Sequence, residues 1–209
     1  IRIWFNEDLE SRNFIIPGII AIIIMIVGAL LTSLVIAREY ENGTMETLKS
    51  LPVKAGELLL GKAIPYFFIG FTDVLVAMLL GQLLFGVVMK GNFLLMMAAT
   101  ALYLCVALAL GLLISSATKS QLVANQVAIL ITYLPSVLLS NFVFPIVNMP
   151  KVLQAITYIV PARYYIDILG GIYLRNTGFT YLWPSMATLA FIALGLAGLN
   201  YVLLKKEGL

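Results

Sequence analysis

Residues 13–37, NFIIPGIIAIIIMIVGALLTSLVIA, form an apolar run with no charged side chain between Arg12 and Arg38. As an α-helix, such a run crosses the roughly 30 Å hydrocarbon core of a bilayer. Similar runs follow along the chain, and none shows the polar–apolar alternation of a membrane β-barrel strand. The sequence therefore predicts an all-α integral membrane protein, because only helices and closed barrels satisfy the backbone in lipid. The expected spanning helices cover about 14–41, 57–89, 92–118, 122–147 and 180–204, in a transmembrane domain over 14–209.

Composition supports a membrane protein and argues against an enzyme. Hydrophobic residues make up 62% of the 209 residues and charged residues 11%, and the mean hydropathy is +1.04, far outside the range of soluble domains. The chain contains no histidine, so it lacks the usual near-neutral base and His metal ligands. Cys105, the one cysteine, excludes an internal disulfide and most cysteine metal sites, and is expected to be a small core residue. We expect no catalytic residue, no metal site and no nucleic-acid partner.

Residues 38–52, REYENGTMETLKSLP, concentrate charge and helix-breaking residues between the first two runs. We expect the first span to continue as one helix to Glu41, and Gly43 to end it in the left-handed conformation. Thr44 suits the N-cap of a new helix, Glu46 falls in its first turn, and Pro52 prevents continuation. The sequence thus predicts a short helix over about 44–51.

Met45, Leu48 and Leu51 recur every three residues and give this short helix an apolar stripe. The stripe suits docking into a groove on a soluble partner, or anchoring of the loop in the headgroup region. The spacing alone leaves both alternatives open. Lys and Arg divide almost evenly between the two membrane faces, but Lys205 and Lys206 abut the last span, which favours the cytoplasm for the hairpin.

Residues 38–53 match the pattern Arg-Glu-aromatic-Glu-x-Gly-Thr-hydrophobic-Glu-x-Leu, followed by a spacer and Pro-Val. The similarity continues over essentially the whole chain through Gly61-Lys62 before Pro65-Tyr66-Phe67, the segment 136–145, Asn148-Met149-Pro150 and Pro161-Ala162-Arg163-Tyr164. The chain resembles the C-terminal portion of the permease subunits of type 2 ATP-binding-cassette exporters. It departs from the usual pattern at Ser140-Asn141, where Ser-Gly is common, and at Gly170-Gly171, where Arg-Gly is frequent.

The resemblance implies a function and a set of partners. The hairpin would supply a cytoplasmic coupling helix that sits in a cleft of an ATPase subunit, which holds ATP and Mg. A second permease subunit would complete a homodimer or heterodimer in the bacterial inner membrane, with room for a periplasmic adaptor, and substrate would move outward. Residues 1–13 would be the end of an extracytoplasmic domain. The implied coupling residues are Arg38, Glu39, Glu41, Gly43, Thr44, Glu46, Leu48 and Pro52.

Residues 56–62, GELLLGK, satisfy the spacing of a phosphate-binding P-loop. Ala63 follows where a Ser or Thr must bind magnesium, and Leu58-Leu59-Leu60 indicates a helix entering a membrane. We therefore expect no nucleotide site and no cofactor in this chain, and we place ATP hydrolysis on a partner.

Asp73 is the one ionisable residue well inside an apolar run. A carboxylate in hydrocarbon is costly, so its side chain should face protein, water or a ligand. It is a candidate pathway residue, or it forms a packing hydrogen bond alongside Thr72 or Gln82. A protonated Asp73 would also suit a second function, a proton- or cation-coupled secondary transporter.

The fourth run is irregular, and proline there frees carbonyl groups and kinks the helix. Two amphipathic segments follow it, after Pro150 and after Pro161, and both are expected to be external interfacial or re-entrant helices. The resemblance implies an external gate over 135–175, with Pro135, Ser140, Asn141, Phe144 and Pro145 as candidate residues. An aromatic belt that anchors the protein in the bilayer is expected from Tyr158, Tyr164, Tyr165, Tyr173, Tyr181 and Trp183.

Overall fold

The computed structural model describes residues 12–86, 89–175 and 177–208. Within these ranges every regular element is helical: α1 (Arg12–Ser33), α2 (Val35–Glu41), α3 (Thr44–Ser50), α4 (Ala55–Phe85), α5 (Phe93–Thr118), α6 (Gln121–Leu138), the 3-10 turn η1 (Ile146–Asn148), α7 (Lys151–Thr157), α8 (Pro161–Leu174) and α9 (Phe179–Lys206). Five segments are long and apolar enough to cross a membrane, namely Ile15–Glu41, Ala55–Phe85, Phe93–Thr118, Gln121–Leu138 and Phe179–Lys206. The predicted all-α class with five spans is confirmed. Residues 1–11, most of the expected extracytoplasmic remnant, lie outside the described residues.

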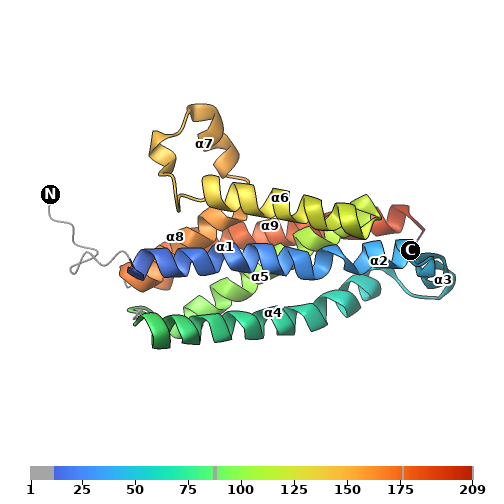
Figure 1. The fold of residues 1–209 in the computed structure, drawn as a ribbon, viewed down its shortest axis with the longest axis horizontal. Coiled ribbons are helices and arrows are strands. Elements are labelled where there is room, and N and C mark those ends of the chain that lie inside the picture. Colours follow the sequence, from blue (N-terminus) through green and yellow to red (C-terminus); the bar gives the residue numbers. More distant parts are fainter. Residues whose placement is uncertain (1–11, 87–88, 176, 209) are drawn as a thin grey trace.

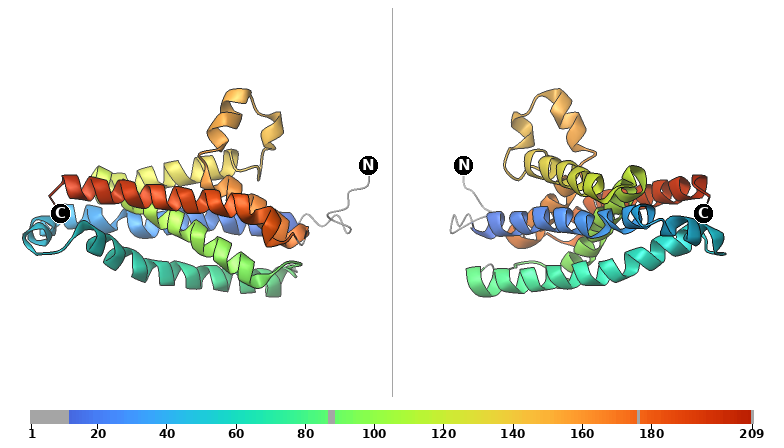
Figure 2. Two further views of the ribbon diagram at one scale, coloured as in Figure 1. Left: turned by 180° about the vertical axis from the view of Figure 1, so that it is seen from behind. Right: turned by 45° about the vertical axis from the view of Figure 1, so that its right-hand side comes forward.

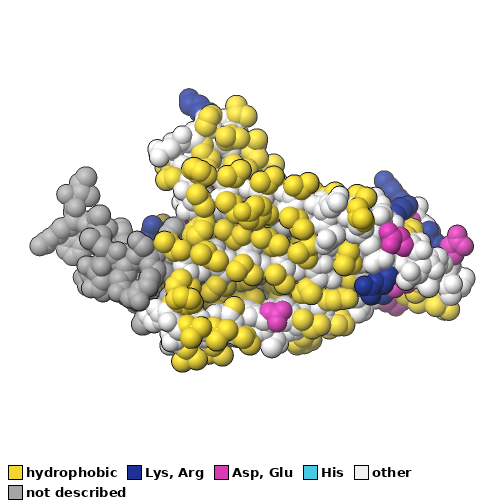
Figure 3. Space-filling view, in the orientation of Figure 1, with side chains coloured by type: hydrophobic (Ala, Val, Ile, Leu, Met, Phe, Trp, Pro, Cys, Tyr) yellow, Lys and Arg dark blue, Asp and Glu magenta, His cyan; other side chains and the backbone are white. Residues whose placement is uncertain are grey.

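The spanning helices form one elongated bundle, in which α1 starts at one end and α9 finishes at the other (Figure 1). α1 is central because it packs against α4, α5, α6 and α8, while α5 crosses the bundle and packs along α9 (Figure 2). Apolar side chains cover the middle of the bundle, and charged side chains gather at the end that carries α2 and α3 (Figure 3). This distribution fits a bilayer around the middle and water at the charged end.

Small residues bring α1 and α5 into close contact. A Cβ atom placed on Gly111 of α5 would lie 2.2 Å from the Ala29 carbonyl oxygen and 2.2 Å from Thr32 Oγ1. Thr32 Oγ1 donates a hydrogen bond across the same contact to the Leu108 carbonyl oxygen, at 2.9 Å. Lipid provides no hydrophobic force between helices, so such close backbone packing and hydrogen bonds hold the two spans together.

The first span extends from Ile15 to Glu41 but contains a one-residue break in its helical hydrogen bonding. α1 ends at Ser33 and α2 begins at Val35, with Leu34 between them in a turn. Proline does not explain this break, since the proline of α1, Pro17, lies much earlier in the helix. The span still reaches Glu41, as expected from the sequence, and the amides that follow the break meet a side chain of α5 that is described below.

The fourth span ends earlier than the expected residue 147. α6 contains Pro135 and stops at Leu138, and the amide of Leu139 makes a final helical hydrogen bond to the Pro135 carbonyl oxygen at 2.9 Å. Asn141 then adopts a left-handed conformation (φ 69°), and its Oδ1 accepts a hydrogen bond from the Ile146 amide at 3.0 Å. These local bonds turn the chain out of the helix, and α7 projects away from the bundle (Figure 2).

The two segments beyond α6 differ from each other. α7 fits the interfacial expectation, because its apolar side chains are largely exposed. α8 instead packs into the half of the bundle opposite α3, against α1, α5, α6 and α9, because apolar residues occupy several of its faces. Two of the expected belt residues are therefore core residues: Tyr165 is fully buried and Tyr173 is 8% exposed. Tyr158, Tyr181 and Trp183 are exposed, as a belt requires.

The buried Tyr165 has a partner for each part of its side chain. Its ring stacks on that of Tyr103 with centroids 4.1 Å apart, and its hydroxyl lies 2.8 Å from Thr100 Oγ1. The Tyr103 hydroxyl donates to the Ala21 carbonyl oxygen at 3.2 Å.

Cys105 was expected in the core, but it is exposed, on the face of α5 that forms a groove with α4 and α9.

Candidate functional site

The hairpin, defined as residues 35–54 with α2 and α3, lies at the charged end of the bundle (Figure 1). Gly43 has a φ of 71°, so it ends α2 in the left-handed conformation, as predicted. The amides of Asn42 and Gly43 donate to the carbonyl oxygens of Arg38 and Tyr40, at 3.0 and 3.2 Å. The chain thereby reverses direction within two residues and places α3 beside α2.

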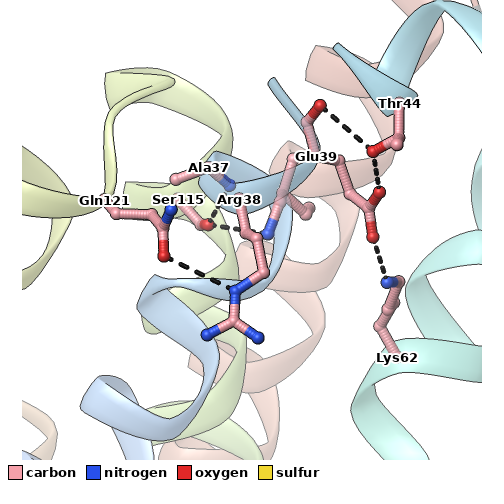
Figure 4. A network of polar contacts seen from close by, with 8 residues as sticks. Ala37, Arg38, Glu39, Thr44, Lys62, Ser115 and Gln121 are labelled. Carbon is pink, nitrogen blue, oxygen red and sulfur yellow. Dashed lines mark hydrogen bonds and ion pairs between the residues drawn. The ribbon is translucent and has the colours of Figure 1, made fainter. Parts of the chain in front are cut away.

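Thr44 has a different role from the predicted N-cap. Gly43 occupies the N-cap position of α3, and Thr44 is the first helical residue. The Thr44 hydroxyl donates to the Glu39 carboxylate and lies 3.3 Å from the Glu39 carbonyl oxygen (Figure 4). The carboxylate is the stronger acceptor, so this bond ties the start of α3 to α2.

The apolar stripe of α3 faces the bundle. Met45 is only 2% exposed and packs with Ile36, Leu58, Leu112 and Leu204. Leu48 is half-buried against the same cluster, whereas Leu51 is 48% exposed. The stripe therefore holds α3 against the ends of the spans. The outer face of α3 is polar, with Thr44, Glu46, Thr47 and Ser50 exposed.

Successive side chains of α2 reach three different parts of the bundle. Glu39 Oε1 pairs with Lys62 Nζ of α4 at 2.6 Å (Figure 4). Glu41 accepts from the Gln121 amide at 2.8 Å and from Gln121 Nε2 at 2.6 Å, at the start of α6. Between them, the Tyr40 ring lies 4.8 Å from Lys119 Nζ at the α5–α6 turn. These contacts join the hairpin to α4, α5 and α6.

Lys119 also links the hairpin region to the end of the chain. Its Nζ pairs with Oε1 of Glu207 at 2.6 Å, just beyond α9. Glu207 Oε2 is buried and has no hydrogen-bond partner among the described residues. Burial raises the pKa of the Glu207 carboxyl above its ordinary value.

Arg38 lies beside a cavity between the spans and the hairpin. Its Nε is 3.5 Å from Gln121 Oε1 (Figure 4), and its side chain is exposed. The cavity has a volume of about 420 Å³ and is bounded by α1, α2, α4 and α6, with Glu39, Lys62 and Asn125 among its lining residues. Its charged end lies at the hairpin, and its apolar end reaches into the spans.

Ser115 of α5 supplies a hydrogen-bond acceptor for the first turn of α2. Its Oγ accepts hydrogen bonds from the amides of Ile36, at 2.9 Å, and Ala37, at 2.8 Å (Figure 4). Both amides follow the interruption at Leu34, and all three groups are buried. The hydroxyl satisfies backbone donors that would otherwise be left in an apolar environment.

The external gate candidates do not form one cluster. Ser140 is buried, and its hydroxyl has no hydrogen-bond partner among the described residues, whereas Phe144 and Pro145 are exposed. Phe142 is the aromatic residue that contacts α1, because a Cβ placed on Gly18 would lie 2.0 Å from its ring. The sequence analysis missed Phe142, which has no local signal that separates it from Phe144.

Asp73 is exposed on α4 beside α1. It lines a cavity of about 170 Å³ with Val27, Gly28 and Gly70. Among the described residues it has no hydrogen-bond or ion-pair partner, and Thr72 bonds within its own helix to the Phe68 carbonyl oxygen at 2.8 Å. Of the earlier alternatives, a packing hydrogen bond to a neighbouring helix is therefore not found in the described part of the chain.

Comparison with known proteins assigns the chain to a family. Residues 2–202 match the family described as ABC-2 family transporter protein. The chain belongs to the ABC-2 transporter family. It is 42% identical over 206 residues to the probable multidrug ABC transporter permease YbhS of Escherichia coli (strain K12), covering 99% of this chain and 55% of that protein.

Two further relatives are similar over the same region. The probable multidrug ABC transporter permease YbhR of Escherichia coli (strain K12) is 30% identical over 207 residues, which is 99% of this chain and 56% of that protein. The inner membrane transport permease YhhJ of the same strain is 29% identical over 210 residues, with coverages of 98% and 54%. The chain thus spans about half the length of the curated relatives it matches.

The P-loop-like segment of this ABC-2 chain is part of a helix. Gly56–Lys62 lies within α4, and Glu57 Oε2 accepts from the Lys54 amide at 3.0 Å to cap the helix start. A P-loop needs an open loop of backbone amides before its helix, so this segment has the wrong conformation for phosphate binding. The predicted exclusion of a nucleotide site here agrees with the helical structure.

Sequence analysis did not predict several residues that surround the hairpin of this ABC-2 chain. Lys62, Ser115, Lys119, Gln121 and Glu207 all contact the hairpin or its partners. One signal was available: the polar gap at 118–121 between the third and fourth runs falls on the same membrane face as the hairpin. Ser115 carried no such signal, because a serine inside a run looks like any small packing residue.

Proposed function

We propose that the chain is the C-terminal portion of an exporter permease, driven by ATPase subunits that act on the hairpin at the cytoplasmic face. The observation that carries this proposal is the two-sided character of α3. Its apolar side is fixed to the bundle through Met45, and its polar side, with Glu46 and Thr47, is open to solvent. A helix held in this way can receive force from a soluble partner and pass it to the spans.

The hairpin residues divide into two roles under this proposal. Glu46, with the neighbouring exposed residues of α3, contacts the ATPase, while Pro52 ends the segment. Glu39, Glu41 and Thr44 hold the hairpin to the bundle through the bonds described above. Gly43 sets the reversal, and Leu48 packs inward. Arg38, exposed beside the cavity, sits where the partner and the spans meet.

The partner subunits supply what this chain lacks. The ATPase binds ATP and Mg, and the permease portion contributes no cofactor. Two relatives are named as permeases of multidrug transporters, and a second permease subunit, identical or homologous, completes the pathway here. The name of a third relative refers to the inner membrane, which supports the bacterial inner membrane as the location. A periplasmic adaptor is a further partner at the opposite face.

The transport path includes the external gate and Asp73. Residues 135–175 close the outer end, with Pro135, Ser140 and Asn141 shaping the turn after α6, and Phe144 and Pro145 exposed on it. Asp73 lies at membrane depth in the α1–α4 cavity. Family membership favours ATP over an ion gradient as the energy source, so a secondary transporter is not retained as a second proposal.

Membrane orientation tests the proposal directly. In a full-length permease from which Cys105 and any other cysteine have been removed, we would introduce Thr47→Cys on α3 and, separately, Val147→Cys on η1, since both positions are exposed. A membrane-impermeant maleimide should label Thr47→Cys only in inside-out vesicles and Val147→Cys only in right-side-out vesicles. Labelling of Thr47→Cys from the outside would place the hairpin beyond the reach of an ATPase and refute the proposal.

Partner binding gives a second test with a matched control. Glu46→Lys reverses a charge on the exposed face of α3, and Lys151→Glu reverses a charge on α7, far from the hairpin. Co-purification of the partner ATPase should be lost or weakened for Glu46→Lys and retained for Lys151→Glu. Equal retention by both variants would remove the outer face of α3 as the contact surface.

A further inference from the structure

The interruption between α1 and α2 leaves backbone donors that α1 cannot satisfy. Leu34, at the N-cap position of α2, has φ −91° and ψ −14° and provides no side-chain cap. The amides of Ile36 and Ala37 occupy the second and third positions of α2. A capping side chain normally accepts its hydrogen bond from an amide at one of these positions.

Ser115 supplies this cap from another helix. Its Oγ accepts from both amides, at 2.9 and 2.8 Å, although Ser115 lies 79 and 78 residues further along the chain. Buried backbone amides without acceptors are costly in an apolar environment. The direction in which α2 leaves the bundle is therefore fixed by α5.

The other end of α2 is also joined to the α5–α6 region. Glu41 binds both the backbone amide and the side chain of Gln121, directly after the α5–α6 turn. α2 is thus bonded at both ends to neighbours other than α1. On the outer side of the interruption, α1 has its own contact with α5 through Thr32 and Gly111.

We propose that Ser115 is a positioning residue that sets the orientation of the hairpin on α5, so that a displacement of α3 passes into α5 and α6 while α1 flexes at Leu34. The route of the displacement rests on the proposed function, because an ATPase must push the hairpin. The positioning of the hairpin by Ser115 does not depend on that source of force. A single continuous first span would instead carry the displacement along α1.

Distances between spin labels test both statements in the full-length permease bound to its partner ATPase. In a background from which Cys105 and any other cysteine have been removed, Thr47→Cys on α3 would be paired with Leu122→Cys on α6 or with Ile23→Cys on α1, all at exposed positions. Trapping with ATP and vanadate should change the Thr47–Ile23 distance and leave the Thr47–Leu122 distance in place. A change confined to Thr47–Leu122, or no change in either pair, would overturn the route.

Substitutions at α5 test the positioning without nucleotide. Ser115→Ala should broaden the Thr47–Leu122 distance distribution. Ser115→Thr, which keeps the hydroxyl, should give a distribution as narrow as that of the wild type. The matched control is Ser116→Ala, because Ser116 is equally buried but donates only within its own helix, to the Leu112 carbonyl oxygen at 3.0 Å. Unchanged distances in Ser115→Ala, or equal broadening in Ser116→Ala, would overturn the positioning role.

The two kinds of failure can be told apart. If the ATPase does not bind, the proposed function fails, yet the resting distances of Ser115→Ala and Ser116→Ala still decide whether Ser115 orients the hairpin. If Ser115→Ala does not insert stably, Ser115→Thr and the wild-type distances remain measurable. In that case a Ser115→Thr distribution as narrow as the wild type supports the hydroxyl as the determinant, and a broadened one counts against it.

Discussion

Gly111→Ala should weaken the protein at the contact between α1 and α5. The added Cβ would lie 2.2 Å from both the Ala29 carbonyl oxygen and Thr32 Oγ1, whereas ordinary van der Waals contacts of a Cβ begin at 3.4 Å. The helices must therefore separate by about 1 Å, since Ala29 presents backbone that cannot rotate away. The separation would also strain the 2.9 Å hydrogen bond from Thr32 to Leu108.

The opposing effects can be compared in size. Overpacking costs about 1–3 kcal/mol, and a hydrogen bond between membrane helices contributes about 0.6 kcal/mol. Replacing a helical Gly by Ala returns about 0.5–1 kcal/mol through the unfolded state. The net expected loss is about 0.6–3 kcal/mol, so the steric effect outweighs the gain in helix propensity.

Gly195→Ala provides the matched control, because a Cβ on Gly195 of α9 meets no atom within 4 Å. Unfolding of the full-length protein in detergent micelles by SDS, followed by circular dichroism, would give the free energy of unfolding of each variant. We expect Gly195→Ala to match or slightly exceed the wild type, and Gly111→Ala to fall below both. If the two variants agree within about 0.5 kcal/mol, the usual range for neutral substitutions, the α1–α5 contact is not as close as described.

Three other substitutions can be measured by the same unfolding assay. Met45→Ala should lose about 2–5 kcal/mol because it opens a cavity under α3, while Leu51→Ala should be nearly neutral because Leu51 is 48% exposed; equal losses would contradict the inward face of α3. Gly43→Ala should cost about 1–2 kcal/mol through its φ of 71° alone, because a Cβ there meets nothing within 4 Å, and a neutral result would reject the left-handed turn. Tyr165→Phe should lose about 0.6–1.7 kcal/mol with its bond to Thr100, and no loss would mean that the hydroxyl is satisfied elsewhere.

The five spans could be predicted because the signal is local. A helix in lipid needs an uninterrupted apolar run, and such runs are visible in the sequence without knowledge of their neighbours. The left-handed Gly43 was equally local, since the turn requires a residue that tolerates positive φ. Family resemblance identified the hairpin as the coupling segment, and that assignment remains a prediction.

The errors arose where a neighbour decides the outcome. Periodicity showed that Met45 and Leu48 share a face of α3, but it could not show that this face meets the bundle rather than a partner. The amides after the break at Leu34 donate to Ser115, a contact that no local pattern around residues 33–37 reveals. Tyr165 looked like a belt residue, although a threonine on α5 allows its hydroxyl to be buried.

The cap on α2 also constrains the order of assembly during synthesis. The ribosome completes α1, α2, α3 and α4 before it reaches Ser115, so the amides of Ile36 and Ala37 receive their acceptor only after α5 has been inserted into the bilayer. A nascent or truncated chain that stops short of α5 would expose an unfinished hairpin. Under the proposed function, a partner ATPase would then meet a finished hairpin only on chains in which α5 has been inserted.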